Sequence, residues 1–430
     1  MSKHPREIPN LVYADEKGRI YDHPALKMAG RSGRLFHPVE PQELIPLPEG
    51  SELFVLPERL PVGWDEKTDE MLVLDQDPET GAKIQAVAAF MAPAYTMTAL
   101  CAFATKQVED ELSPLPLFAY TAVGWYKGRF WVSGFRSDPD PRQDLKNFDP
   151  QMVRTRTLAR LKRDRENRLV QHLGRCSLTY GCPAARNLFM GRWEAPLPTS
   201  PVCNARCLGC LSYQSPGGPP ATQERIRFVP TPEEVAGVAV AHLKRVKNAI
   251  VSFGQGCEGE PLLQGRLIAD SIKLIRSRTQ DGTINLNTNA SLPAVVEELI
   301  SAGLDSMRIS MNSVRSCYYH AYYKPRGYTQ NDVLSSWKIM KEASRFVSLN
   351  LFVFPGITDE LREVERLSSL IEEIGLDLIQ LRNHNIDPDW YLKGIDYDFT
   401  GTRLGVKNMV KILKKRFPKL RFGYFNPPVR

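Results

Sequence analysis

Three cysteines stand within eight residues of the chain, at Cys203, Cys207 and Cys210, in the spacing C-x3-C-x2-C. Thiolates are metal ligands, and three on one loop are one fewer than a closed zinc or iron–sulfur site needs. The nearest upstream histidine is His172, and no second C-x2-C pair follows. We therefore expect an iron–sulfur cubane with one open iron, rather than part of a zinc ribbon or three unrelated thiols.

The triplet resembles the signature of the radical SAM family, in which S-adenosylmethionine (SAM) binds the open iron of a 4Fe–4S cluster. Downstream, the run 259–261 is similar to the family's Gly-Gly-Glu-Pro turn, with Glu258 in place of its first glycine. The resemblance implies one 4Fe–4S cluster held by the three cysteines. It also implies that Gly259 and Glu260 bind the amine of SAM, because a carboxylate can bind an ammonium group. A surface turn rich in Gly and Glu is the alternative.

Polar residues follow three further predicted strands. The run 287–290 resembles the family's Thr-Asn-Gly turn, with Ala290 in place of Gly, and implies a role for Asn289 in orienting SAM or substrate. A helix-capping turn explains this run as well. The resemblance also implies SAM contacts for Ser310 and Asn312. Arg382, in the polar run 380–385, is a further candidate for the cofactor pocket.

The resemblance implies an enzyme in which the cluster reductively cleaves SAM to a 5′-deoxyadenosyl radical for hydrogen abstraction. Its substrate, a small molecule, a peptide or RNA, is not identified by the sequence. An external reductant such as flavodoxin or ferredoxin is implied as a partner. Two alternatives stay open, namely an iron–sulfur electron-transfer or scaffold protein and an RNA-modifying radical SAM enzyme.

The remaining cysteines allow more than one role. Cys176 and Cys182 are interpreted as buried, inert thiols. Cys257 lies inside the Gly-Glu turn, where we expect it to face the barrel mouth as a catalytic thiol, with a packed small residue as the alternative. A second cluster that includes some of these cysteines or Cys317 also stays open. No cysteine follows Cys317, where the family's C-terminal auxiliary-cluster domain would place ligands.

The positions of these residues depend on an alternation of predicted strands and helices. Helix signals include Thr231 as an N-cap before Pro232 and Glu234, and Ser291 as the cap of a helix through Ile300. Alternating strands and helices predict parallel pairing, with chemistry at the carboxyl ends of the strands. The expected fold is α/β: a partial (β/α)6 TIM-type radical SAM barrel preceded by a β-rich (α+β) domain. The predicted strands after the triplet cover 249–253, 283–287, 307–311, 349–354, 376–381 and 420–425.

We expect four segments along the chain. Residues 1–150 form a β-rich domain of unknown role, with a hairpin over 117–135 that turns at Lys127-Gly128. Residues 151–192 form a basic helical linker, with a solvated helix face as the first interpretation and a docking surface as the second. Residues 193–400 form the barrel. Residues 401–430 supply a helix and a strand that complete or flank it.

Composition is typical of a globular protein with a mild positive charge. Among 430 residues, 56 Lys and Arg oppose 49 Asp and Glu, a net charge of +7 that favours no particular partner. The uncharged stretch 84–105 is rich in Ala and Thr and is interrupted by Pro93, which predicts buried strands rather than a membrane span. The first residues lead into no apolar segment, so we expect no signal peptide and a cytoplasmic location without membrane contact.

Overall fold

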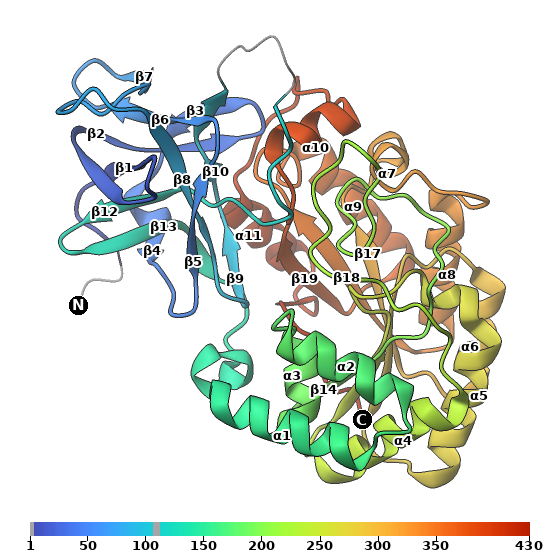
Figure 1. Ribbon diagram of the computed structural model, residues 1–430. Helices are drawn as coiled ribbons and strands as arrows, with labels where there is room; N and C mark the ends of the chain where they lie inside the picture. Colours follow the sequence, from blue (N-terminus) through green and yellow to red (C-terminus); the bar gives the residue numbers. More distant parts are fainter. Residues whose placement is uncertain (1–3, 106–111) are drawn as a thin grey trace.

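A computed structural model gives the structure of residues 4–105 and 112–430, and within these residues two β-sheets organise the fold (Figure 1). The first sheet is antiparallel and belongs to the N-terminal part of the chain. The second is parallel, and most of the helices surround it. A group of three helices lies in the chain between the two sheets.

Thirteen strands of the described residues form the antiparallel sheet, and short 3₁₀ turns cover Pro41–Glu43, Pro141–Gln143 and Leu145–Asn147. Most of its strands are short, although β2 (Ile20–Ser32) has 13 residues. The stretch 84–105 lies in four of them, which confirms the prediction of buried strands. The strands are β1 (Asn10–Asp15), β2 (Ile20–Ser32), β3 (Leu35–Pro38), β4 (Leu44–Pro46), β5 (Glu52–Leu56), β6 (Arg59–Asp65), β7 (Glu70–Val73), β8 (Ile84–Phe90), β9 (Tyr95–Met97), β10 (Leu100–Cys101), β11 (Phe103–Thr105), β12 (Val123–Tyr126) and β13 (Arg129–Arg136).

The predicted hairpin is present as β12 and β13, with Val123 opposite Val132. Both turn residues have positive φ, 49° at Lys127 and 77° at Gly128, which matches the twist of a two-residue hairpin turn. The first strand of the hairpin was predicted too long, because residues 117–120 precede β12 and lie outside any strand. Across the described residues, no helix is long and apolar enough to cross a membrane.

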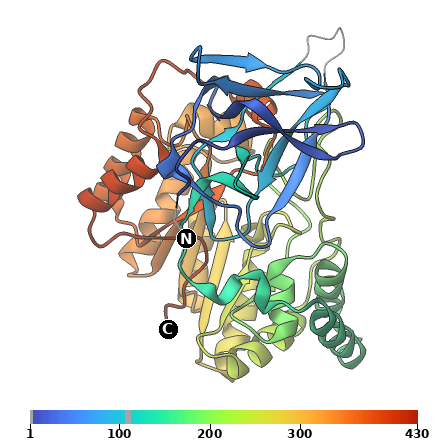
Figure 2. The same cartoon turned by 90° about the vertical axis from the view of Figure 1, so that its left-hand side faces the viewer.

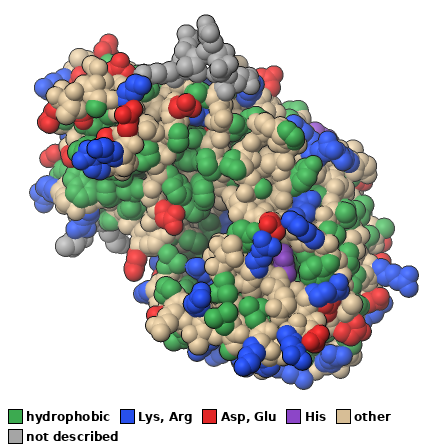
Figure 3. Space-filling view, viewed as in Figure 1, with side chains coloured by type: hydrophobic (Ala, Val, Ile, Leu, Met, Phe, Trp, Pro, Cys, Tyr) green, Lys and Arg blue, Asp and Glu red, His purple; other side chains and the backbone are tan. Residues whose placement is uncertain are grey.

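The basic segment forms three helices: α1 (Pro150–Arg163), α2 (Arg168–Leu178) and α3 (Pro183–Met190). The chain breaks between α1 and α2 because Asn167 is the N-cap of α2, where its side chain accepts a hydrogen bond from the amide of Val170 at 3.1 Å. The exposed basic side chains of this segment face solvent, which is compatible with a solvated helix face and with a docking surface, and Lys and Arg side chains are scattered over this lower part of the molecule in Figure 3. They are Arg154, Arg156, Lys162, Arg163, Arg165, Arg168 and Arg175.

Seven parallel strands, all within the described range 112–430, form the second sheet. Their order follows the chain from β14 to β20 without closing, so the sheet is a partial barrel with one strand beyond the six units expected. The strands are β14 (Glu194–Leu197), β15 (Ile250–Phe253), β16 (Thr283–Thr288), β17 (Ser306–Met311), β18 (Phe346–Val353), β19 (Leu378–Asn383) and β20 (Arg421–Gly423).

Helices connect these strands and bury their apolar faces against the sheet, where strand residues such as Val251 and Ile309 are fully buried. Thr231 and Glu234 form the expected capping box at the start of the first connecting helix. The cap predicted at Ser291 was wrong, because Pro293 begins the next helix after Leu292. The helices are α4 (Pro232–Arg245), α5 (Gly265–Arg278), α6 (Pro293–Ala302), α7 (Ser316–Tyr323), α8 (Gln330–Glu342), α9 (Leu361–Ile374), α10 (Pro388–Ile395) and α11 (Val406–Arg416), with a 3₁₀ turn at Pro261–Gln264.

The antiparallel sheet contacts the carboxyl end of β19. Thr96 in β9 donates a hydrogen bond to the carbonyl of Leu381 at 3.0 Å, and the amide of Met97 donates to the side chain of Asn383 at 2.9 Å. Asn383 in turn donates to the carbonyl of Tyr95 at 3.0 Å. The two sheets therefore lie side by side at the edge where chemistry is expected, as Figures 1 and 2 show.

Candidate cluster and cofactor site

The cysteine triplet lies on the long loop that follows β14, at the carboxyl edge of the parallel sheet. Helix α7 holds this loop through backbone hydrogen bonds. The amide of Leu208 donates to the carbonyl of Tyr322 at 3.0 Å, and the amide of Arg206 donates to the carbonyl of Tyr323 at 2.9 Å. Because the main chain of the loop is anchored, the three cysteines have a fixed place relative to the strand ends.

The three thiols suit a cluster better than a single ion. All three are half-buried. Burial, with the neighbouring carboxyl of Glu260, raises the pKa of Cys203 to about 11, and burial and the other two thiols raise the pKa of Cys207. Among the described residues, these three sulfurs do not form a group within 4.8 Å of one another. Sulfurs that bind different irons of a cubane lie farther apart than sulfurs on one ion, so the donor set fits a three-cysteine cluster.

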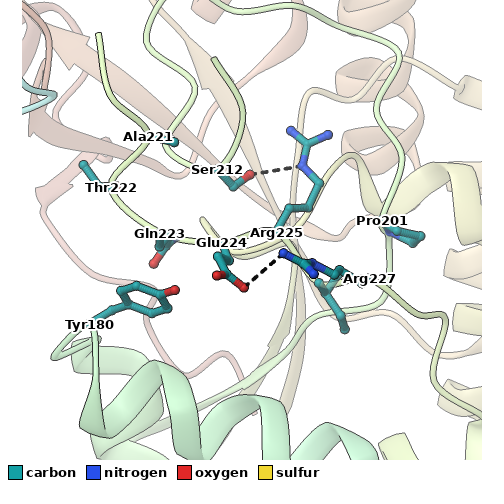
Figure 4. A pocket seen from close by; sticks show the side chains of 10 residues that line it. Tyr180, Pro201, Ser212, Ala221, Thr222, Gln223, Glu224, Arg225 and Arg227 are labelled. Atoms are coloured by element: carbon teal, nitrogen blue, oxygen red, sulfur yellow. Dashed lines mark hydrogen bonds and ion pairs between the residues drawn. The ribbon is translucent and has the colours of Figure 1, made fainter. Parts of the chain in front are cut away.

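Arg225 reaches the third cysteine of the triplet. Its Nη2 lies 3.4 Å from the Sγ of Cys210, and its Nε donates to the Oγ of Ser212 at 3.1 Å. A guanidinium at a cysteine sulfur stabilises negative charge there. Ser212 and Arg225 also line a cavity of about 520 Å³, shown in Figure 4. The lining comprises Tyr180, Pro201, Ser212 and residues 221–227.

Glu260 lies after β15 with its carboxylate buried beside the triplet loop. Its Oε1 accepts hydrogen bonds from the Thr288 hydroxyl and from the Leu262 amide at 3.0 Å, and its Oε2 accepts one from the Asn289 amide at 2.9 Å. Burial raises the pKa of Glu260 to about 7. A carboxylate has about four acceptor positions, so three donors leave one position for a further donor.

Glu258, two residues earlier, accepts four hydrogen bonds from its own chain. Its Oε2 accepts hydrogen bonds from the amides of Thr199 at 2.7 Å and Ser200 at 2.9 Å and from the Thr199 hydroxyl at 3.2 Å. Its Oε1 accepts the amide of Gln255 at 2.7 Å. These four donors join the turn after β15 to the end of β14 and hold the Glu258 carboxylate in place.

Gly259 allows the Glu-containing turn to lie against the triplet loop. Its amide donates to the carbonyl of Ser200 at 2.7 Å, and the amide of Glu260 donates to the carbonyl of Val202 at 2.9 Å. A Cβ at position 259 would lie 1.9 Å from the carbonyl oxygen of Val202, a distance that no side chain permits. The glycine is therefore required for the close approach of the two backbones.

The other expected ligand residues lie at the ends of the next strands. The side chain of Asn289 donates to Asn204, inside the triplet loop, at 2.9 Å. The Oγ of Ser310 accepts a hydrogen bond from Asn350 at 3.4 Å. The amide group of Asn312 donates to the Tyr318 carbonyl and the Tyr391 hydroxyl, both at 3.2 Å, and its buried Oδ1 has no hydrogen-bond partner among the described residues.

Arg382 lies near a second arginine inside the sheet. Its guanidinium covers the ring of Tyr424 at 4.2 Å, and its buried Nε has no hydrogen-bond partner within residues 4–105 and 112–430. The Nε of Arg308 is likewise buried and unpartnered there. Burial and the charge of Arg382 lower the pKa of Arg308 to about 9. Two neighbouring guanidiniums with free donors can bind a carboxylate or phosphate group.

Cys257 is placed differently from expectation. Its side chain is buried in a cluster with Cys176, Cys182 and the partly buried ring of Tyr180, against helices α2 and α3. Its Sγ also lies within 4.8 Å of a nitrogen of His172. The structure thus brings Cys257 together with the upstream thiols that sequence reasoning treated as inert.

Sequence reasoning missed the aromatic side chains of α7. Tyr319, Tyr322 and Tyr323 are buried, and each has Cys207 among the charges that raise its pKa. The hydroxyl of Tyr322 lies 3.1 Å from the Nε2 of His384, whose pKa burial lowers to about 3. The run Tyr-Tyr-His-Ala-Tyr-Tyr at 318–323 was the available signal, because four tyrosines on a short helix need a large apolar surface to cover them.

Comparison with known proteins finds a match over the segment from the end of β14 into α9. A model of the Radical SAM superfamily matches residues 197–367. No curated protein matches the chain. Among solved structures, HydG, a maturase of the FeFe-hydrogenase, is 16% identical with a TM-score of 0.39, covering 64% of this chain and 66% of HydG. SuiB of Streptococcus suis bound to S-adenosylmethionine is 14% identical, with the same TM-score and coverage. Methylornithine synthase (PylB) is 13% identical with a TM-score of 0.37, covering 62% of this chain and 77% of its own.

Proposed function

We propose, from the match of residues 197–367 to the Radical SAM superfamily, that this chain is a radical SAM enzyme that binds one 4Fe–4S cluster through Cys203, Cys207 and Cys210. The bound cluster and SAM would together supply a 5′-deoxyadenosyl radical for hydrogen abstraction from a substrate. The chain's own residues hold the cluster, bind and orient SAM, and exclude competing reactions.

The vacant acceptor position of Glu260 is the observation that supports this proposal most directly. The backbone of Glu260 pairs with Val202, the residue before the first cysteine, so its carboxylate lies beside the triplet loop. A buried carboxylate with three fixed donors and one vacant position is arranged to accept a hydrogen bond from an ammonium group. Glu258 is tied to Thr199 and Ser200 at the end of β14. We therefore assign Glu260, beside the triplet loop, to the amine of SAM.

We assign the remaining contacts to SAM to residues at the carboxyl ends of β16, β17 and β19. We assign Asn289 to orienting the triplet loop and SAM together, because its side chain already bonds to Asn204. The Ser310 hydroxyl and the unpartnered Oδ1 of Asn312 offer hydrogen bonds to hydroxyl groups of the ligand. Arg382, with Arg308 beside it, offers donors to a carboxylate of SAM or of the substrate.

An external reductant such as flavodoxin or ferredoxin completes the proposed system, within the cytoplasm. The position of Arg225 at Cys210, with exposed Arg175 and Arg227 nearby, favours an acidic electron donor at this edge of the site. The substrate is a small molecule, a peptide or RNA. The N-terminal sheet contributes to its recognition in this proposal, because β9 lies against the end of β19.

Anaerobic reconstitution with iron and sulfide, followed by reaction with SAM and dithionite, tests the proposal. We expect about four irons per chain and release of 5′-deoxyadenosine, whereas S-adenosylhomocysteine would indicate methyl transfer. Replacing the three cysteines by alanine should abolish both iron binding and product. Cys317→Ala, at an exposed cysteine of α7, serves as the control and should change neither. Cluster binding without 5′-deoxyadenosine would instead identify an electron carrier or scaffold.

A further inference from the structure

A second group of metal-binding side chains lies away from the triplet. His172 and Cys176 are four residues apart in α2, so they share one face of the helix. Their side chains are 3.6 Å apart, Nε2 to Sγ. Cys257, from the turn after β15, joins them, and ligand atoms of the three residues all lie within 4.8 Å of one another. Cys176 and Cys257 are buried, with 1% and 4% of their surface exposed.

Cys182 supplies a fourth donor at the same place. It is the N-cap residue of α3, and its amide donates to the carbonyl of Cys176 at 3.0 Å. It packs in one cluster with Cys176 and Cys257. The sulfur of Cys182 does not lie within 4.8 Å of all the other ligand atoms. The Cys182 side chain must therefore rotate for all four residues to bind one ion. Three thiols and one imidazole are a donor set that structural zinc sites use.

The type and spacing of these ligand atoms favour zinc. Zinc binds sulfur at about 2.3 Å and nitrogen at about 2.0 Å, so tetrahedral ligands on one ion lie roughly 3.5–3.8 Å apart. The 3.6 Å between His172 Nε2 and Cys176 Sγ falls in that range, and the ligand atoms of all three residues lie within 4.8 Å of one another, whereas the triplet sulfurs are spread more widely. We propose that His172, Cys176, Cys182 and Cys257 bind a single tetrahedral zinc ion, separate from the cluster of the triplet.

The zinc ion fixes the Glu-containing turn to the helical segment. Cys257 lies in the turn that also carries Glu258 and Glu260, and its carbonyl accepts the amide of Ile226 at 2.7 Å. The metal thus joins α2 and α3 to the segment that positions Glu260 beside the triplet loop. In this assignment Cys257 is a metal ligand rather than a catalytic thiol, and binding of the metal requires that the thiols lose their protons.

The test uses the full-length chain in which Cys203, Cys207 and Cys210 are replaced by alanine, so that it does not depend on the proposed function. Protein purified under reducing, anaerobic conditions is stripped with a chelator and titrated with Zn²⁺ and with Co²⁺. We expect one Zn²⁺ per chain and a Co²⁺ spectrum with thiolate charge-transfer and tetrahedral d–d bands. Adding Cys257→Ser should weaken Zn²⁺ binding at least 10-fold, as for loss of a metal ligand. The control Cys317→Ser should leave it unchanged.

Four outcomes would overturn the zinc site: no bound Zn²⁺ in the triplet variant, equal affinity after Cys257→Ser, iron with sulfide in place of zinc, or a disulfide between Cys176 and Cys257 in peptide mapping. If Cys257→Ser does not fold, His172→Ala replaces it, because His172 is only half-buried. His172→Ala should weaken Zn²⁺ binding and shift the Co²⁺ bands toward those of an all-sulfur site. An unchanged spectrum and affinity in that variant would likewise contradict the proposal.

Discussion

Arg59 and Asp387 form a buried ion pair between the two sheets. The Nη2 of Arg59, at the start of β6, lies 3.3 Å from the Oδ2 of Asp387, and their side chains are 4% and 2% exposed. Asp387 also caps α10 and accepts the amide of Leu115 at 2.7 Å. A buried charge is costly unless it is paired, so Arg59 and Asp387 must stay in contact. This contact fixes the N-terminal sheet to the carboxyl edge of the parallel sheet.

Arg59→Ala should destabilise this contact. Removal of one partner of a buried ion pair leaves the other charge unpaired and costs about 3–5 kcal/mol. The midpoint of urea unfolding, measured by circular dichroism, should therefore fall clearly. Arg19→Ala is the matched control, because Arg19 pairs with Asp15 on the surface with 66% of its side chain exposed, and it should have little effect. Equal midpoints for the two variants would contradict the role of the buried pair.

Glu260→Gln should weaken SAM binding to the reconstituted protein. A hydrogen bond to a charged group contributes about 1.5–3 kcal/mol, which corresponds to roughly a 10- to 150-fold rise in the Kd. Equilibrium dialysis with labelled SAM measures this change, with iron content checked in parallel. Glu365→Gln, an exposed residue of α9, is the control with the same change of charge. SAM affinity that is the same in both variants would show that Glu260 does not bind the amine.

Gly259→Ala should disturb the approach of the Glu-containing turn to the triplet loop. The new Cβ would meet the carbonyl of Val202, so the hydrogen bonds between the two backbones must break or lengthen. We expect a loss of about 1–3 kcal/mol in stability and a lower iron content after reconstitution. Gly237→Ala in α4, where only the Asn167 side chain lies within 4 Å, should leave iron content at the wild-type level. A full cluster in Gly259→Ala would exclude this requirement.

Glu363 should make stability depend on pH. It lies buried in α9, where it accepts hydrogen bonds from the Ser313 hydroxyl at 2.7 Å and the Val314 amide at 3.1 Å. Burial raises its pKa from 4.5 to about 7, although Arg315 opposes the change and Glu360 adds to it. The folded protein therefore holds this proton more tightly than the unfolded chain. Its contribution is present below pH 4.5 and is lost as the pH rises to about 7, by roughly 3 kcal/mol.

The variant Glu363→Gln isolates that contribution, because glutamine has the same shape and does not titrate. Unfolding free energies measured between pH 4.5 and 7 should fall less steeply with rising pH in the variant than in the wild type. Glu258 and Glu260, whose pKa values burial also raises, contribute equally to both proteins and cancel in the difference. Parallel curves for the two proteins would show that Glu363 does not titrate in this range.

The sequence by itself determined features that depend on near neighbours in the chain. The spacing of Cys203, Cys207 and Cys210 indicated a cluster, and the alternation of apolar runs with capping signals predicted the parallel strands and their connecting helices. The capping box of Thr231 and Glu234 was predictable because both partners lie within one turn. At Ser291 the same reasoning was wrong. The Ser291 amide donates a hydrogen bond to the side chain of Asn289, and α6 begins at Pro293 rather than directly after Ser291.

Only the tertiary structure decided which distant groups meet. Glu258 and Glu260 look alike in the sequence, but the fold ties the carboxylate of Glu258 to Thr199 and Ser200 and places Glu260 beside the triplet loop. Cys176 and Cys257 are far apart in the sequence, and their thiols come together because α2 and α3 pack on the turn after β15. The place of the N-terminal sheet also depends on long-range contacts, such as that of Arg59 with Asp387. Periodicity and capping act over a few residues, whereas contacts between segments depend on how whole surfaces pack together.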